Sequence, residues 1–440
     1  MVDGEKKMKI CVCGLWHLGS VTAACLAELG HTVWALDPDS KVIEDLKGGK
    51  PPIYEPGLEE AVRSGIEKGD LRFTTDAASA LKDADHVWLA FDTPVDDNDV
   101  ADIDLLQKNI RKIMPHIKDG AKVIISSQAP VGFTARMEKL FAASCPGKKA
   151  FFACSPENLR LGKAMESFMK PDRIVVGLRT MRDKQEFAPL FSSISSRVEW
   201  MRTESAEMTK HAINSFLALS VCFANEIAAI CELTGADAGE VERGLKTEQR
   251  IGPKAYLRPG AAFAGGTLAR DIDYLSKLSE KNGLPSVLLN SVKRSNDLHK
   301  GWIERTCLAA FKNLRGKKFA FLGLTYKPGT DTLRRSPAIE LARTLTIKGA
   351  SVSAFDPAVK SLDKKIASFI SLKSGIKEAV LDCDAVVIMT EWKEFRELKN
   401  DEINIIAKRV VIDPNGFLEN IFSVRGVRYI SVGRAAKEIK

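Results

Sequence analysis

Hydrophobic residues along the chain alternate between short apolar runs and longer stretches in which they recur at helical spacing. Short runs bounded by Gly, Asp or Ser are typical of buried strands, and the stretches between them are typical of helices. Strands and helices in alternation predict a doubly wound α/β domain around a mostly parallel sheet. In the first half of the chain the predicted strands are Lys9–Val12, Thr32–Leu36, His86–Ala90, Lys122–Ser126 and Ile174–Val176.

The pattern changes in the middle of the chain and then resumes. An unbroken helical period predicts one long helix over Ser205–Thr234, which Gly235 would end. Strand, loop, helix and strand return from Gly316 onward, with Lys318–Leu322 and Ser351–Phe355 as the strands. The predicted fold class is α/β, with two Rossmann-like doubly wound domains joined by a long central helix. The predicted boundaries are 1–203 for the N-terminal domain, 204–300 for the central helical region and 316–440 for the C-terminal domain.

Composition narrows the class of protein. A chain of 440 residues with 45% hydrophobic and 28% charged content is typical of a soluble protein with several domains, and we judge no apolar run long enough to span a bilayer. The N-terminus mixes acids with lysines, which argues against a signal peptide and predicts a cytoplasmic protein. Nine scattered cysteines without a CxxC pair predict buried thiols and no metal site. The net charge of +8 is spread along the chain, which favours anionic small molecules and not nucleic acid.

The first predicted strand leads into a turn that begins at Gly14 and ends at Gly19, and a helix, a second strand and Asp37 follow. This order is the frame of a dinucleotide-binding βαβ unit, in which the glycines permit a tight turn and close helix packing. Asp37 can bind an adenosine ribose hydroxyl and would repel a 2′-phosphate, which favours NAD over NADP. Trp16 replaces the middle glycine of the motif, so the turn by itself leaves a purely structural role open.

A second segment of unusual composition lies between Arg250 and Asp271, where small residues, glycines and prolines surround Phe263. Such a loop lets its backbone approach a ligand closely. An apolar-periodic helix is predicted from Asp271, so the loop leads to a helix N-terminus, which suits an anion. The turn-forming residues in the segment are Pro259, Gly260, Gly265 and Gly266.

This loop resembles the active-site loop of the UDP-glucose/GDP-mannose dehydrogenase family. Thr267 stands where the family has its nucleophilic cysteine, and Arg270 where it has a lysine. Elsewhere Gln128 replaces a threonine and Leu161 a glutamate, and the segment Asp413–Gly416 lacks an arginine. The matches cover nearly the whole chain and include Arg250, Ile251, Gly252, Pro259, Gly260, Phe263, Asp271, Thr93-Pro94, Glu55-Pro56-Gly57-Leu58, Glu157, Lys327, Arg334 and Thr390-Glu391-Trp392.

The resemblance implies roles for the candidate site residues. Lys210 and Asn214, four residues apart on the predicted long helix, would stabilise the alkoxide of a sugar alcohol. Asp271 or Glu157 would hold a water as proton acceptor, and Thr267 would bind a ligand through its hydroxyl or act as a weak nucleophile. The predicted cofactor-binding residues are Gly14, Gly19, Asp37, Thr93, Pro94 and Gln128; the predicted substrate-binding residues are Arg250, Phe263, Gly266, Arg270, Lys327 and Arg334.

These expectations describe an NAD-dependent oxidoreductase that acts on the CH–OH group of a nucleotide-diphosphate sugar, similar to a UDP-glucose 6-dehydrogenase that feeds polysaccharide precursor synthesis. The residues that oxidise the alcohol match the family, and those that trap the aldehyde do not. Two alternatives therefore stay open: a reversible oxidation that epimerises the sugar with retained NAD, and a redox-silent nucleotide-sugar binding protein. The apolar character of Ala212–Cys231 predicts a homodimer. No nucleic acid or membrane is expected as a partner.

Overall fold

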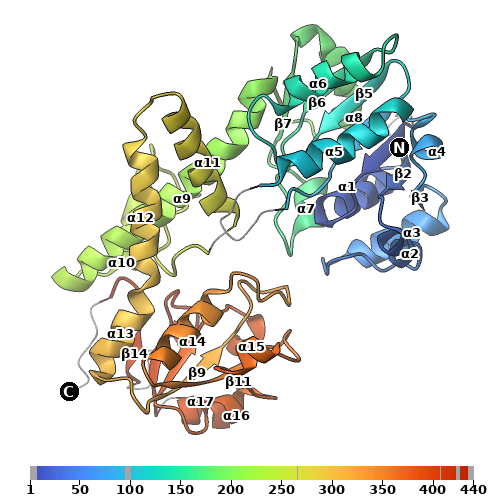
Figure 1. The fold of residues 1–440 in the computed structure, drawn as a ribbon. Coiled ribbons are helices and arrows are strands. Elements are labelled where there is room, and N and C mark those ends of the chain that lie inside the picture. Colours follow the sequence, from blue (N-terminus) through green and yellow to red (C-terminus); the bar gives the residue numbers. More distant parts are fainter. Residues whose placement is uncertain (1–6, 95–100, 265, 407, 423–426, 435–440) are drawn as a thin grey trace. The chain divides into compact units, whose positions relative to one another are not determined.

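The structure is a computed structural model that describes residues 7–94, 101–264, 266–406, 408–422 and 427–434 (Figure 1). It divides into two compact units, Met1–Ala212 and Ile213–Lys440. The long helix α9 (Thr203–Thr234) begins in the first unit and ends in the second. Gly265, which belongs to the predicted ligand loop, lies outside the described residues.

The first unit is built on a sheet whose strands follow the order β3-β2-β1-β4-β5-β6-β7-β8. Its described neighbours are parallel, except that β7 runs antiparallel to β6. The sequence predicted a parallel sheet, and the reversal at β7 was missed because a strand's run of apolar residues carries no direction. The strands are β1 (Lys9–Cys13), β2 (Thr32–Leu36), β3 (Leu71–Thr74), β4 (His86–Leu89), β5 (Ala121–Ile125), β6 (Ala150–Cys154), β7 (Ile174–Leu178) and β8 (Val198–Arg202).

This sheet is covered on both faces. Ile10 and Val12 of β1 belong to one hydrophobic cluster, and the alternate residues Cys11 and Cys13 belong to another. Alternation of this kind places successive side chains on opposite faces of a sheet, so the unit is doubly wound. Its helices are α1 (His17–Glu28), α2 (Ser40–Lys47), α3 (Leu58–Glu67), α4 (Ala77–Leu81), α5 (Ile103–Ile113), α6 (Phe133–Ser144), α7 (Ala164–Met169) and α8 (Lys184–Ile194).

The second unit joins a group of helices to another parallel sheet, with strand order β11-β10-β9-β12-β13-β14. Phe319 and Phe321 of β9 pack into one cluster, and Ala320 and Leu322 pack into another, so this sheet is also covered on both faces. The strands are β9 (Lys318–Leu322), β10 (Ser351–Phe355), β11 (Ser371–Leu372), β12 (Ala385–Ile388), β13 (Val410–Ile412) and β14 (Tyr429–Ile430). The helices are α10 (Ala238–Thr247), α11 (Thr267–Lys281), α12 (Val287–Lys300), α13 (Trp302–Phe311), α14 (Pro337–Ile347), α15 (Lys364–Ala367), α16 (Ile376–Val380), α17 (Asn400–Ile406) and α18 (Glu419–Phe422).

The predicted fold class is confirmed, because the structure contains two doubly wound sheets and a long central helix. Strands β2, β9 and β10 span the residues that the sequence predicted for them. The start of α11 was predicted wrongly. This helix begins at Thr267 and not at Asp271, directly after Gly266 with a φ of +107°. Thr267 and Arg270 therefore lie on the first helical turn and Asp271 begins the second, so none of the three lies in the loop.

Helix α9 has an unusual surface for a helix of a globular protein. By length and composition alone it is apolar enough to cross a membrane, with a hydropathy of 1.7 over a window that is 39% buried; only the described residues were searched. The prediction that no run reaches this length is therefore wrong by that measure. The side chains of Phe216, Phe223 and Ile230, seven residues apart, are 66%, 45% and 55% exposed and form a stripe along one side of the helix.

Candidate active site

The turn between β1 and α1 fits a dinucleotide because side chains are excluded from it. Gly14 has a φ of +89°, and a Cβ there would lie 2.5 Å from the Cα of Phe91. A Cβ on Gly19 would lie 1.6 Å from the carbonyl oxygen of Gly14, so the first turn of α1 packs directly on this backbone. Only glycine fits at either position. The backbone of the turn is thereby left open to an anion at the N-terminus of α1.

Trp16 occupies the middle-glycine position of this turn without straining it. Its φ is −71° and its side chain is 48% exposed. The position therefore needs no left-handed backbone, and the indole lies on the surface beside the turn. This is the physical reason why a motif that looks damaged in the sequence still forms the expected turn.

Asp37, at the end of β2, is held as a hydrogen-bond acceptor beside the same turn. Its Oδ2 accepts from the backbone N–H of Leu15 at 2.7 Å, and its Oδ1 accepts from the N–H of Asp39 at 2.9 Å. A carboxylate fixed in this position can accept a further hydrogen bond from a ribose hydroxyl and repels a phosphate. The residues of the turn therefore fit NAD.

Two other predicted cofactor loops meet at the carboxyl ends of β4 and β5. Thr93 is buried, and its Oγ1 donates to the carbonyl oxygen of Gln128 at 2.9 Å. Pro94 follows Thr93 and is exposed. Ligands of open α/β sheets bind at these strand ends, so the structure brings Thr93, Pro94 and Gln128 together at the expected edge.

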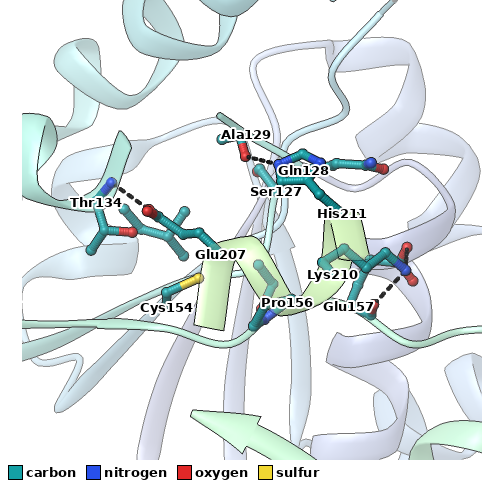
Figure 2. A pocket seen from close by; sticks show the side chains of 12 residues that line it. Ser127, Gln128, Ala129, Thr134, Cys154, Pro156, Glu157, Glu207, Lys210 and His211 are labelled. Atoms are coloured by element: carbon teal, nitrogen blue, oxygen red, sulfur yellow. Dashed lines mark hydrogen bonds and ion pairs between the residues drawn. The ribbon is translucent and has the colours of Figure 1, made fainter. Parts of the chain in front are cut away.

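The first unit also holds the catalytic candidates Lys210 and Glu157 in contact (Figure 2). The Nζ of Lys210 lies 3.0 Å from Oε1 of Glu157 and donates to the backbone carbonyl of Glu157 at 2.8 Å. Their side chains are only 14% and 22% exposed, so water screens this ion pair less than a surface pair. The pair fixes the loop after β6 to helix α9.

A small cavity of about 20 Å³ lies beside this pair and is large enough for one water molecule. Figure 2 shows Glu207 turned toward Thr134 and Lys210 turned toward Glu157. Glu207 accepts from the N–H groups of Gly132 and Thr134, the latter at 2.8 Å, and so caps α6. His211, which the sequence did not mark as a site residue, places its Nε2 3.2 Å from the carbonyl oxygen of Ala129 in a hydrogen bond. The sequence feature that could have pointed to His211 is its position four residues after Glu207, which places both side chains on the same face of α9.

In the second unit, Asn214 and Asp271 form a buried pair. The Nδ2 of Asn214 donates to Oδ2 of Asp271, and the two residues are 5% and 1% exposed. Thr267 lies one turn before Asp271 on α11 and is exposed, while Arg270 is half-buried. The catalytic candidates thus form two contacting pairs, and Thr267 is the member that faces solvent in this unit.

The second unit contains a cavity of about 400 Å³, a volume typical of small-molecule sites. Phe263 and Lys327 line it as predicted, whereas Gly266 and Arg334 do not belong to its lining and Arg335 does. Arg335 has a φ of +59°, which is rare for a residue with a side chain. The role of Arg334 stays a prediction, because a sequence does not reveal which of two neighbouring arginines the backbone turns toward a cavity.

Predicted substrate residue Arg250 lies away from this cavity. Its side chain is 88% exposed and pairs with Glu248 at 2.9 Å. The cavity instead has Glu391 at its wall, and burial raises the pKa of that carboxyl. Burial also lowers the pKa of His299, another lining residue. Other lining residues that the sequence analysis did not assign are Trp302, Tyr326 and Asn415.

The loop before α11 is held by three amide side chains, of which Asn225 and Asn296 are buried and Asn415 is half-buried. Asn225 accepts from the N–H of Gly260 at 2.9 Å, and Asn415 accepts from the N–H of Ala261 at 2.7 Å. Asn296 bonds both the N–H and the carbonyl of Phe263, at 3.0 and 2.9 Å. These bonds satisfy backbone groups of Gly260, Ala261 and Phe263. Side chains from other parts of the unit therefore hold residues 260–263 of the loop.

All nine cysteines are free and buried, as the sequence predicted. Burial raises the pKa of Cys383 to about 11 and of Cys307 to about 12. Cys154 lines the small cavity beside Lys210, and its pKa is also raised by burial. Because the thiolate is the reactive form, these thiols are poor nucleophiles at neutral pH.

These features define the class of protein. One unit has a dinucleotide turn with a carboxylate placed to accept from a ribose hydroxyl. The other unit has a cavity of small-molecule size with Lys327 and Arg335 in its lining, and the two features together are typical of a dehydrogenase that binds a dinucleotide and an anionic substrate. Three domain models match the chain in order: the NAD binding domain over residues 8–195, the central domain over 204–298 and the UDP binding domain over 320–420. The chain belongs to the UDP-glucose/GDP-mannose dehydrogenase family.

Individual relatives agree with this assignment. The UDP-glucose 6-dehydrogenase of Rhizobium meliloti is 35% identical over 437 residues, which cover 97% of this chain and 100% of the relative. That of Bacillus subtilis is 32% identical, covering 97% and 94%. The structure of a UDP-glucose dehydrogenase from Pyrobaculum islandicum matches with a TM-score of 0.85 at 28% identity, covering 100% of this chain and 97% of that one.

The predicted enzyme class and cofactor are thereby confirmed: the protein is an NAD-dependent nucleotide-sugar dehydrogenase that acts on a CH–OH group.

The carboxylate of Asp37 gives a testable prediction. Replacing Asp37 with Ser removes the charge that repels a 2′-phosphate, so the affinity for NADPH should rise relative to that for NADH by about tenfold or more. Fluorescence titration of both cofactors against wild type and Asp37→Ser measures the change. Asp39→Ser, on an exposed residue two positions on, is the matched control and should leave the ratio unchanged. A wild-type preference for NADPH would refute the role given to Asp37.

Proposed function

We propose that the protein oxidises the primary C6 hydroxyl of a UDP-hexose such as UDP-glucose, in the cytoplasm, and supplies a precursor for polysaccharide synthesis. The observation that carries the proposal is the polar set on α9, with Lys210 beside Glu157 and Asn214 beside Asp271. The names of the relatives, UDP-glucose 6-dehydrogenases, support this substrate. The UDP binding domain over residues 320–420 supports the nucleotide.

Oxidation of an alcohol needs a hydride acceptor, a proton acceptor and a group that stabilises charge on the oxygen. Bound NAD supplies the hydride acceptor. Lys210 and Asn214 lie one turn apart on α9, so their side chains leave the helix on the same side, and both carry N–H donors for a developing alkoxide. The carboxylate of either Asp271 or Glu157 accepts the hydroxyl proton through a water molecule.

The cavity of the second unit suits the nucleotide diphosphate. Lys327 and Arg335 line it and supply positive charge for phosphate oxygens. Phe263, Trp302 and Tyr326 supply apolar surface for a base or sugar ring. Glu391 lines the same cavity, and burial raises the pKa of its carboxyl group. This carboxyl is a further hydrogen-bonding group for the substrate.

The fate of the aldehyde product depends on Thr267. A threonine hydroxyl has no thiolate-like fraction at neutral pH and needs a base to attack a carbonyl. The cysteines are buried, so none of them replaces the missing thiol. If an acid is made, the second oxidation passes through the hydrated aldehyde, with the water activated by Asp271 or Glu157.

Turnover of a panel of nucleotide sugars tests the proposal, with NADH measured by absorbance and the product by mass spectrometry. NADH release with a product two or four electrons more oxidised supports the dehydrogenase. Turnover to an isomer without NADH release would support reversible oxidation with retained NAD. Binding without turnover would support a redox-silent binding protein.

Lys210→Ala and Asn214→Ala should each lower turnover on the order of a hundredfold or more, because each removes a preorganised donor to the developing oxyanion. Steady-state kinetics and thermal unfolding of each variant check this result. Lys277→Ala and Asn282→Ala, on exposed residues of the same types, are the matched controls and should retain activity. Unchanged turnover in either active-site variant would place the chemistry elsewhere.

The number of NADH molecules released per sugar oxidised should reflect the absence of a thiol nucleophile. Because the hydrated-aldehyde route is slower than thiol trapping, aldehyde should accumulate and the NADH released per sugar should fall below two. Intact-protein mass spectrometry during turnover should show no acyl adduct, and iodoacetamide should not inactivate the enzyme rapidly. A cysteine-linked adduct, or inactivation that substrate prevents, would contradict this prediction.

We also propose that the protein is a homodimer that buries the exposed stripe of Phe216, Phe223 and Ile230 on α9. Apolar surface of this extent is costly to leave in water. Sedimentation at micromolar concentration without detergent should therefore show a dimer, and Phe223→Glu should yield monomer. Tyr256→Glu, at a residue 59% exposed outside the stripe, is the control and should remain dimeric. A wild-type monomer would refute the proposal.

A further inference from the structure

Glu55 is a buried carboxylate whose partners come from distant parts of the first unit. Its side chain is fully buried, and its oxygens accept from the N–H groups of Gly162 at 2.9 Å and Ala164 at 2.7 Å. These donors open helix α7, whose N-cap residue Lys163 makes no side-chain cap of its own. Glu55 therefore caps α7 from more than a hundred residues away in the sequence. A buried charge of this kind is stable only while it keeps its donors.

The third donor to Glu55 is His17. The Nε2 of His17 lies 3.1 Å from Oε2 of Glu55, and the side chain of His17 is 18% exposed. Because both oxygens of Glu55 already accept backbone hydrogens, the carboxylate is the acceptor and the imidazole donates. His17 is also the first residue of α1, inside the turn that the dinucleotide phosphates approach. His17 thus lies in the cofactor turn and also contacts the carboxylate that caps α7.

The segment that Glu55 holds is the loop that carries Glu157. At its far end, Glu157 accepts from the N–H of Leu159 at 2.8 Å and pairs with Lys210 at 3.0 Å (Figure 2). At its near end, Gly162 has a φ of +85° and is bonded to Glu55. The loop is therefore fixed at two points, by Lys210 at one and by Glu55 with His17 at the other.

We propose that His17 is a positioning residue that transmits occupancy of the dinucleotide turn, through Glu55, to the loop that orients Glu157 against Lys210. Cofactor binding orders the first turn of α1, which fixes the imidazole donor and so secures the carboxylate on which Gly162 and Ala164 depend. The loop then holds Glu157 more firmly when the cofactor is in place than when the turn is empty. The effect on turnover rests on the role proposed above for Glu157 and Lys210, whereas the structural link does not.

Hydrogen exchange measures this link without a sugar substrate. Peptides that cover residues 156–164 should exchange more slowly when NADH is added at a saturating concentration. Opening the loop breaks the hydrogen bonds from Gly162 and Ala164 to Glu55, and this opening should cost more free energy when NADH is bound. In His17→Phe, which removes the donor, NADH should still protect the α1 turn but should lose most of its effect on the loop. His17→Gln keeps an N–H donor and should restore the effect. His116→Phe, at an exposed histidine of the same unit, is the control.

A double-mutant cycle tests whether His17 and Glu55 act as one unit. His17→Phe and Glu55→Gln should each lower kcat about tenfold, the size expected when a hydrogen bond to a charged group is lost. The double variant should be no worse than the poorer single variant, since residues in one network do not add. Thermal unfolding of His17→Phe should be close to wild type, because its side chain is partly exposed.

The outcomes separate this link from the proposed reaction. Loop protection that is equal in wild type and His17→Phe, or absent in wild type, would overturn the link whatever the enzyme oxidises. Additive losses in the cycle would overturn it as well. If no nucleotide sugar is turned over but NADH protects the loop through His17, the proposed substrate is wrong and the link stands.

Discussion

The ligand loops of both units depend on polar side chains of α9 that are buried and bonded to backbone groups of other elements. In the first unit, Glu207 caps α6 and His211 bonds the loop after β5. In the second, Asn225 bonds the N–H of Gly260, and Glu232 accepts from the N–H of Gly433 at 2.8 Å. A buried polar group left without its partner costs about 1–3 kcal/mol. Helix α9 therefore holds the backbone of these loops in place within each unit. This role is not apparent from the mostly apolar composition of the helix.

Much of the scaffold could be predicted because its signals are local. Strands β2, β9 and β10 are apolar runs with polar or glycine boundaries. The spacing of Gly14 and Gly19 predicts the turn between β1 and α1. The predictions that failed depend on distant residues. The start of α11 follows a glycine at a φ of +107° and a loop held by side chains from other elements, and no window of the sequence contains those partners. The choice between Arg334 and Arg335 likewise depends on a left-handed backbone at Arg335.

The retained and altered residues of the site differ in physical character. Asp37, Glu157, Asn214 and Asp271 are bonded to other groups of the protein, so a change at any of them leaves a polar partner unsatisfied. Thr267 is exposed in its unit. A replacement there disturbs little of the packing around it, so the fold places few limits on which residue occupies this position.

This difference separates the two halves of the chemistry. Hydride transfer from an alcohol requires a positioned substrate, a proton acceptor and donors for the oxygen. The side chains proposed as acceptor and donors are held in contact with one another, as Lys210 with Glu157 and as Asn214 with Asp271. Carrying the aldehyde further requires a nucleophile that is accessible and deprotonated. The thiols of this chain are inaccessible, and burial raises the pKa of several of them, such as Cys307 and Cys383. Buried thiols with raised pKa values do not supply such a nucleophile, which is the physical basis for proposing water in that role.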